Sequence, residues 1–87
     1  MTYDFDMLAS DLATGREIEF EFNNTKYSIT CFENRTKILF DDSNQILIHE
    51  FKCLSDKNEL SSILIGTTTL ESIFRDKLYD TTTLYVL

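Results

Sequence analysis

Residues 17–22 read Glu-Ile-Glu-Phe-Glu-Phe, and after Asn23-Asn24 the chain continues as Thr-Lys-Tyr-Ser-Ile-Thr-Cys-Phe over residues 25–32. Acidic and apolar side chains alternate without a break across residues 17–22, which is the two-residue period of a half-buried strand. Asparagine tolerates the positive φ that a two-residue hairpin turn requires. The stretch therefore predicts an antiparallel β-hairpin.

A two-residue turn also fixes the register of this hairpin. The inner face is predicted to pair Phe22 with Thr25, Phe20 with Tyr27, and Ile18 with Ile29. The outer face is predicted to pair Glu21 with Lys26, Glu19 with Ser28, and Glu17 with Thr30. Each face is chemically consistent, because apolar residues oppose apolar ones and acids oppose a base or hydroxyls.

Upstream of the hairpin, residues 3–13 have the apolar spacing of an amphipathic helix, with its stripe at Phe5, Leu8, Ala9 and Leu12. We expect Thr2 to cap this helix and Asp4 and Asp6 to lie in its first turn, where the helix dipole favours negative charge. Gly15 can supply the left-handed residue that ends it.

Downstream of the hairpin, a turn is expected at residues 33–35 and a third strand at residues 36–41, with Ile38 and Phe40 facing inward. The turn cluster at residues 41–44 separates it from a fourth strand at residues 45–52, whose apolar residues occur on both faces. This pattern predicts a fourth strand that is covered on both sides.

The second half of the chain predicts two short helices and a final strand. Asp56 and Glu59 have the spacing of a capping box, and Thr69 can cap the second helix. The predicted apolar positions of the helices are Leu60, Ile63, Leu64, Leu70, Ile73, Phe74 and Leu78, with Gly66 ending the first helix. Residues 81–86 are expected to form a strand that is held in the sheet. The chain is thus predicted to be one α+β domain over residues 1–87, with an N-terminal helix, a four-stranded antiparallel meander, two short helices and a C-terminal strand.

Composition excludes several classes of function. The chain of 87 residues has a net charge of −7, which opposes direct binding to nucleic acid, and it has no glycine-rich phosphate loop. Neither a secretory signal nor a membrane-length apolar run occurs, so we expect a cytoplasmic protein with cysteine thiols. If a phage encodes it, that cytoplasm is the host's.

The negative charge is concentrated near the N-terminus. Residues 1–21 hold six acids and one base, whereas residues 22–87 hold nine acids and seven bases. Glu17, Glu19 and Glu21 would repeat at roughly 6.6–6.8 Å along one strand face, a spacing on the scale of that between phosphates. One interpretation is a row that binds a basic protein surface, flanked by Asp4 and Asp11. The other is an ordinary solvated face, which Lys26 opposite Glu21 supports.

Two sets of residues could suggest chemical sites. Cys31, His49 and Cys53 could suggest zinc or a Cys-His catalytic pair, but a fourth ligand and an oxyanion hole are not indicated. We therefore expect two thiols and a surface histidine. Asp41-Asp42 could serve acid-base chemistry, but between two strands they favour a turn. No cofactor, metal site or catalytic residue is predicted, and we expect a protein that is not an enzyme.

The stretch from Asp11 to Phe20, Asp-Leu-Ala-Thr-Gly-Arg-Glu-Ile-Glu-Phe, followed by Tyr-Ser-Ile-Thr at 27–30, resembles a group of small uncharacterised proteins. They come from phages, prophages and mobile elements of Gram-positive bacteria. Asn-Glu-Leu at 58–60 and Thr-Leu-Glu-Ser-Ile-Phe at 69–74 resemble later helices of that group. The chain departs from the group in lacking a Gly-Trp after the second strand and in having Phe74 in place of a usual Trp.

The resemblance implies a genomic context and carries over no site residues. Small acidic proteins of mobile elements are often inhibitors of host defence, of anti-CRISPR or anti-restriction type. The leading hypothesis is therefore an acidic protein-binding module that occludes a basic site on a nucleic-acid-handling protein, without touching nucleic acid or membrane itself. The alternatives are an antitoxin or immunity protein, or a structural protein that forms homo-oligomers.

Overall fold

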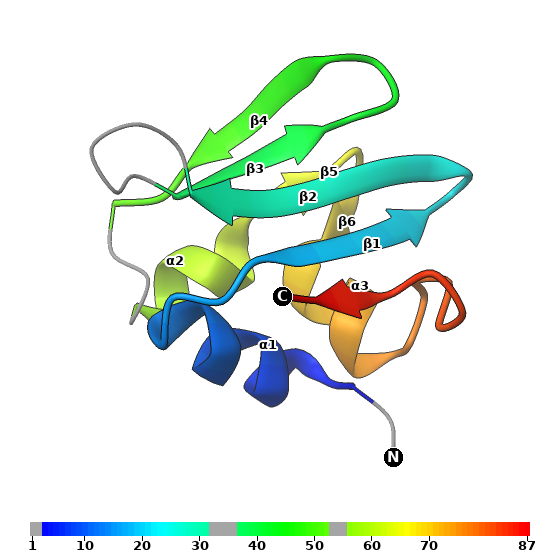
Figure 1. The fold of residues 1–87 in the computed structure, drawn as a ribbon. Coiled ribbons are helices and arrows are strands. Elements are labelled where there is room, and N and C mark those ends of the chain that lie inside the picture. The colour runs from blue at the N-terminus through cyan, green and yellow to red at the C-terminus, as the bar shows by residue number, and fades with distance from the viewer. Residues whose placement is uncertain (1–2, 32–36, 53–55) are drawn as a thin grey trace.

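The computed structural model describes residues 3–31, 37–52 and 56–87. It contains a five-stranded antiparallel sheet in the order β4-β3-β2-β1-β7 and a separate two-stranded sheet of β5 and β6 (Figure 1). The elements are α1 (Phe5–Ala13), β1 (Ile18–Phe22), β2 (Thr25–Cys31), β3 (Lys37–Asp41), β4 (Ile46–Glu50), α2 (Lys57–Ser62), β5 (Leu64–Ile65), β6 (Thr68–Thr69), α3 (Leu70–Arg75) and β7 (Tyr85–Val86). The predicted α+β class, with its N-terminal helix, meander, short helices and C-terminal strand, is confirmed.

The hairpin that decides the fold has the predicted register. β1 pairs with β2 from Ile18–Ile29 to Phe22–Thr25, and the turn residues Asn23 and Asn24 have φ values of 51° and 61°. Both turn residues are therefore left-handed, as a tight hairpin that follows the twist of its strands requires.

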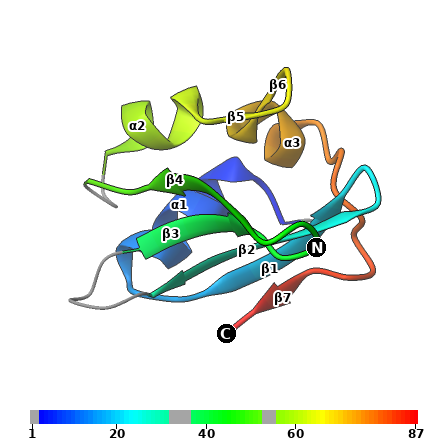
Figure 2. The same ribbon diagram turned by 90° about the horizontal axis from the view of Figure 1, so that it is seen from above.

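One hydrophobic core joins the three helices to the inner face of the five-stranded sheet. The helices α2 and α3 lie together on one side of this sheet (Figure 2). Phe74 of α3 is fully buried at its centre, with ring contacts to Tyr3, Phe20 and Tyr79 at centroid distances of 6.1, 5.1 and 4.8 Å. The helix stripe Phe5, Leu8, Ala9 and Leu12 is buried in the same core. This packing fixes which face of β1 points outward.

The N-terminal cap of α1 differs from the prediction. Asp4 is the cap, and its carboxylate accepts a hydrogen bond from the backbone N–H of Met7 at 2.9 Å. The proposed cap, Thr2, lies outside the described residues, whereas Asp6 does lie in the first turn. Asp4 caps the helix because its side chain can reach the backbone N–H of the third helical residue. Gly15 follows the helix with φ of 90°, as predicted.

The predicted orientation of the third strand is wrong. Lys37, Leu39 and Asp41 are the buried residues of β3, while Ile38 and Phe40 lie on the outer face and are half-buried. The register explains this, because Leu39 pairs with Ile29, which belongs to the inner face. Two polar residues thus occupy inner positions.

Both polar residues on the inner face of β3 have hydrogen-bond partners. The Lys37 ammonium donates to the backbone carbonyls of Gly15 and Arg16 at 3.2 and 2.6 Å, joining β3 to the end of α1. The Asp41 carboxylate accepts from the backbone N–H and side-chain amide of Asn44, both at 2.9 Å. The bond from the Asn44 amide is the main reason that the pKa of Asp41 lies below its usual value.

The fourth strand is not covered on both sides. β4 is an edge strand with Ile46 and Leu47 about half exposed, and its pairing with β3 shifts register between Leu39 and Phe40. Such an irregularity twists an edge strand locally. Although β4 is rich in apolar residues, it is not a buried strand, and its apolar residues do not alternate regularly between the two faces.

The second half also departs from the expected boundaries. α2 ends at Ser62, and the chain then forms the β5–β6 hairpin around Gly66, so Leu64 is exposed instead of helical. Thr69 caps α3 as predicted. That helix ends at Arg75, which leaves Leu78 exposed and buries Tyr79 in its place. The final strand is held beside β1 but covers only Tyr85–Val86.

Candidate functional site

The acidic residues of β1 point away from the hydrophobic core. Ile18 and Phe20 are buried, whereas Glu19 is exposed and Glu21 is half-buried on the outer face. Glu17 immediately precedes β1, and its backbone exchanges hydrogen bonds with that of Leu87 at 2.7 and 3.4 Å. The alternation of residues 17–22 thus aims Glu19 and Glu21 at the same side of the sheet.

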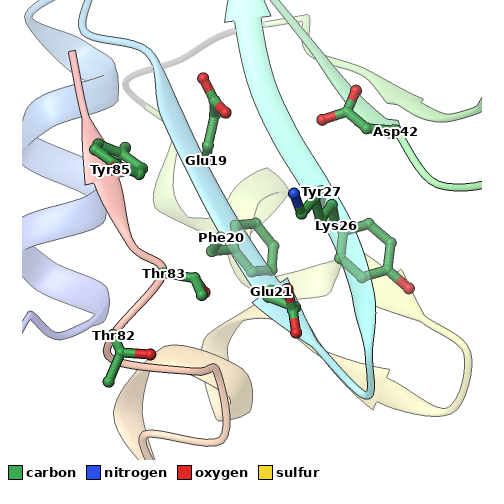
Figure 3. Close-up of a pocket in the computed structure, with 9 residues that line it drawn as sticks. All are labelled: Glu19, Phe20, Glu21, Lys26, Tyr27, Asp42, Thr82, Thr83 and Tyr85. Carbon is green, nitrogen blue, oxygen red and sulfur yellow. The ribbon is translucent and has the colours of Figure 1, made fainter.

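A small pocket of about 220 Å³ lies on this side of the sheet (Figure 3). It is lined by residues of β1, of the start of β2, of the turn after β3 and of the C-terminal segment: Glu19, Phe20, Glu21, Lys26, Tyr27, Asp42, Thr82, Thr83 and Tyr85. Figure 3 shows Tyr85 and Glu19 on neighbouring strands, with Lys26 on the next strand. The site therefore joins segments that are far apart in sequence.

Local hydrogen bonds hold the C-terminal segment in place as one wall of the pocket. The backbone N–H of Asp80 donates to the carbonyl of Glu21 at 2.7 Å. The Asp80 carboxylate then accepts from the backbone N–H and hydroxyl of Thr82, and these bonds lower the pKa of Asp80. After this turn at Asp80, the chain continues into β7, in which Tyr85 pairs with Glu19. Tyr85 is 64% exposed and lines the pocket, so its side chain is accessible to a ligand.

Negative charge dominates the pocket. Three acidic residues, Glu19, Glu21 and Asp42, line it together with one basic residue, Lys26. Within residues 3–31, 37–52 and 56–87, Lys26 forms no ion pair within 4 Å, although its backbone pairs with Glu21 as predicted. Asp6, by contrast, has Lys57 and Arg75 within 3.3 and 3.5 Å. The charge of the pocket is thus neutralised less directly than that of Asp6.

The other three predicted site residues, Glu17, Asp4 at the N-cap of α1 and Asp11 within α1, do not line the pocket. The Asp4 carboxylate caps the helix, and the Asp11 carboxylate accepts a hydrogen bond from the Tyr3 hydroxyl at 2.6 Å. Both side chains therefore have local structural roles. Burial, and then the bond to Asp11, raises the pKa of Tyr3 well above its usual value.

Tyr3→Phe is expected to destabilise the protein by about 1 kcal/mol at neutral pH, through loss of the hydrogen bond to Asp11. Because the folded-state pKa of Tyr3 is raised, its contribution is complete below the unfolded pKa of about 10 and is lost as the pH rises above it. The variant should therefore lose less stability than the parent in this alkaline range. Urea unfolding at neutral and alkaline pH measures both effects, and an unchanged alkaline slope would contradict the assignment to Tyr3.

The residues considered for metal or thiol chemistry are only partly described. The side chain of Cys31 and all of Cys53 lie outside the described residues. His49 Nε2 is 2.9 Å from the Glu59 carboxylate, which also accepts from the backbone N–H of Lys52 at 2.9 and 3.2 Å. Glu59 thus connects α2 to β4. Within the described part of the chain, no group of three or more potential ligands is placed to hold a metal ion.

Asp41 and Asp42 lie at the turn that the sequence indicates. Asp41 holds the turn through Asn44, and the Asp42 carboxylate accepts a hydrogen bond from the Ser28 hydroxyl at 3.1 Å. Asp42 additionally reaches the pocket, which the sequence did not indicate.

Comparison of the chain with models of known families, with curated proteins and with solved structures finds no match. In the described part of the chain, no helix is both long and apolar enough to cross a membrane.

Proposed function

We propose that this protein is a non-enzymatic, acidic protein-binding module. Its role would be that of a phage or mobile-element inhibitor, of anti-CRISPR or anti-restriction type, that occludes a basic site on a nucleic-acid-handling host defence protein. The observation that supports this function best is the outward placement of Glu19 and Glu21 beside the exposed ring of Tyr85.

The arrangement suits a partner that normally binds a polyanion. Same-face carboxylates on a strand repeat at roughly 6.6–6.8 Å, and a basic groove attracts such a row over a distance that salt limits. The aromatic ring adds contact area, which charge alone does not provide. Glu17, Glu19 and Glu21 form the proposed contact row, while Asp4 and Asp11 contribute negative charge from α1.

Reversing the charge of this row is expected to weaken partner binding at least tenfold. The variant is Glu19→Lys together with Glu21→Lys, two changes at outer positions of β1 that leave the core untouched. The partner would be captured from a lysate of a Gram-positive host and identified by mass spectrometry. Binding of the purified partner would then be measured by calorimetry at about 50 and 500 mM salt.

Two controls make this test specific. The single variant Glu19→Lys is compared with Asp76→Lys, which changes the net charge equally but on the exposed end of α3 and should leave affinity within twofold. A nucleic-acid ligand of the partner should compete with the parent protein. Equal binding by the double variant, or binding that is insensitive to salt, would refute the electrostatic mechanism.

A further inference from the structure

We infer that the pocket beside Tyr85 is an anchor site for a single arginine side chain of a basic partner protein. The inference rests on the proposed function and specifies the chemistry of its contact. It follows from the size of the pocket, its charge and the exposed aromatic ring at its wall.

The size of the pocket indicates a side chain and not a small-molecule ligand. At about 220 Å³ it lies below the range of roughly 300–1,000 Å³ that is typical of cofactor and substrate sites. Protein interfaces concentrate their binding energy in a few anchor residues that fill small pockets, and arginine is enriched among them.

The charge of the pocket selects a cation. Three acidic residues, Glu19, Glu21 and Asp42, line it, against a single basic residue, Lys26. Asp42 already accepts a hydrogen bond from Ser28, which holds that carboxylate in position. The hydroxyls of Thr82 and Thr83 at the rim can accept further hydrogen bonds from a donor-rich group.

The aromatic wall favours arginine over lysine. Tyr85 is 64% exposed and pairs with Glu19, so an aromatic and an acidic side chain belong to neighbouring positions of β7 and β1. A planar guanidinium can stack on an aromatic ring while its N–H groups donate to a carboxylate, whereas an ammonium group is a compact and strongly hydrated charge.

Substitution of Lys26 tests the arginine site independently of Tyr85. The Lys26 ammonium group shares the pocket with the acids and would repel an incoming guanidinium. Because no ion pair within 4 Å holds it in the described part of the chain, its removal should cost little stability. Neutralising Lys26 should therefore strengthen arginine binding.

The test is an NMR titration of the whole chain with a blocked hexa-arginine peptide, in parallel with hexa-lysine and the uncharged hexa-citrulline. We expect the arginine peptide to shift the amide signals of Glu19, Glu21, Thr83 and Tyr85, and to bind more tightly than lysine, with citrulline weakest. Tyr85→Ala should lower arginine affinity about two- to fivefold, and Lys26→Gln should raise it about twofold or more. Tyr85→Phe, which keeps the ring, should restore the parent affinity.

Failure of this inference is distinct from failure of the proposed function. If arginine and lysine peptides bind equally, and Tyr85→Ala changes neither, the arginine site is refuted, while the acidic row is still tested by Glu19→Lys with Glu21→Lys. Shifts confined to α1 would also overturn the inference, because they would place the cation at Asp4 or Asp11. Circular dichroism of each variant confirms that the fold is retained.

Discussion

Phe74→Ala is expected to lower the free energy of unfolding by about 3–5 kcal/mol, the largest effect that we predict for a single substitution. Phe74 is completely buried and touches the rings of Tyr3, Phe20 and Tyr79, so its removal leaves a cavity where α3 meets β1 and the N-terminal segment. A domain of this size has a total stability on the order of 5–15 kcal/mol. The variant should therefore be only marginally folded at room temperature.

Equilibrium urea unfolding measures this effect, with Leu78→Ala as the matched control. Leu78 lies four residues later and is 49% exposed, so its truncation should cost about 0.5 kcal/mol or less. A loss below about 1.5 kcal/mol for Phe74→Ala would show that the three rings can close the cavity, and would remove Phe74 from the centre of the core.

Lys37→Ala is expected to cost about 2–4 kcal/mol. The substitution removes a buried side-chain stem and also the ammonium group that donates to the carbonyls of Gly15 and Arg16. A hydrogen bond involving a charged group contributes about 1.5–3 kcal/mol. Lys37→Met, which keeps most of the stem, should recover part of the loss and so separate packing from hydrogen bonding.

The matched control for Lys37 is Lys26→Ala, since Lys26 is an exposed lysine on the neighbouring strand. We expect it to change the free energy of unfolding by about 0.5 kcal/mol or less. Equal losses for the two alanine variants in urea unfolding would mean that the bonds from Lys37 to the α1–β1 connection do not stabilise the fold.

The parts of the fold that could be predicted are those in which local pattern and packing agree. Residues 17–22 alternate cleanly, and two asparagines supply the turn, so the hairpin register is correct to the residue. For β3 the alternation misleads, because Ile38 and Phe40 are more apolar than Lys37 and Asp41 but lie outside. Hydrogen bonds make both polar residues acceptable inside. Those from Lys37 to Gly15 and Arg16 are long-range, whereas those that Asp41 accepts from Asn44 lie within one turn.

The candidate site could be predicted only in part for a similar reason. The acidic row follows from the period of β1, which places Glu19 and Glu21 outward. Tyr85 and Thr83 join them through the pairing of β7 with β1, a contact between opposite ends of the chain. The sequence indicates that the C-terminal strand pairs with another strand, but it does not indicate which edge of the sheet this strand joins. The charge of Asp4 and Asp11 suggests a place beside the row, but charge does not reveal their local hydrogen bonds to Met7 and Tyr3.

The position of β7 has a consequence for the order of folding. The four strands of the meander pair through short connections, whereas β7 must close a loop from residue 18 to residue 86. Loop closure of that length costs more entropy than a hairpin, so it follows the local pairs. Because Glu19 and Tyr85 become neighbours only at that step, a ligand that needs both binds the completed fold and shifts the folding equilibrium toward it. Binding at this site would therefore report on the pairing of β7 with β1.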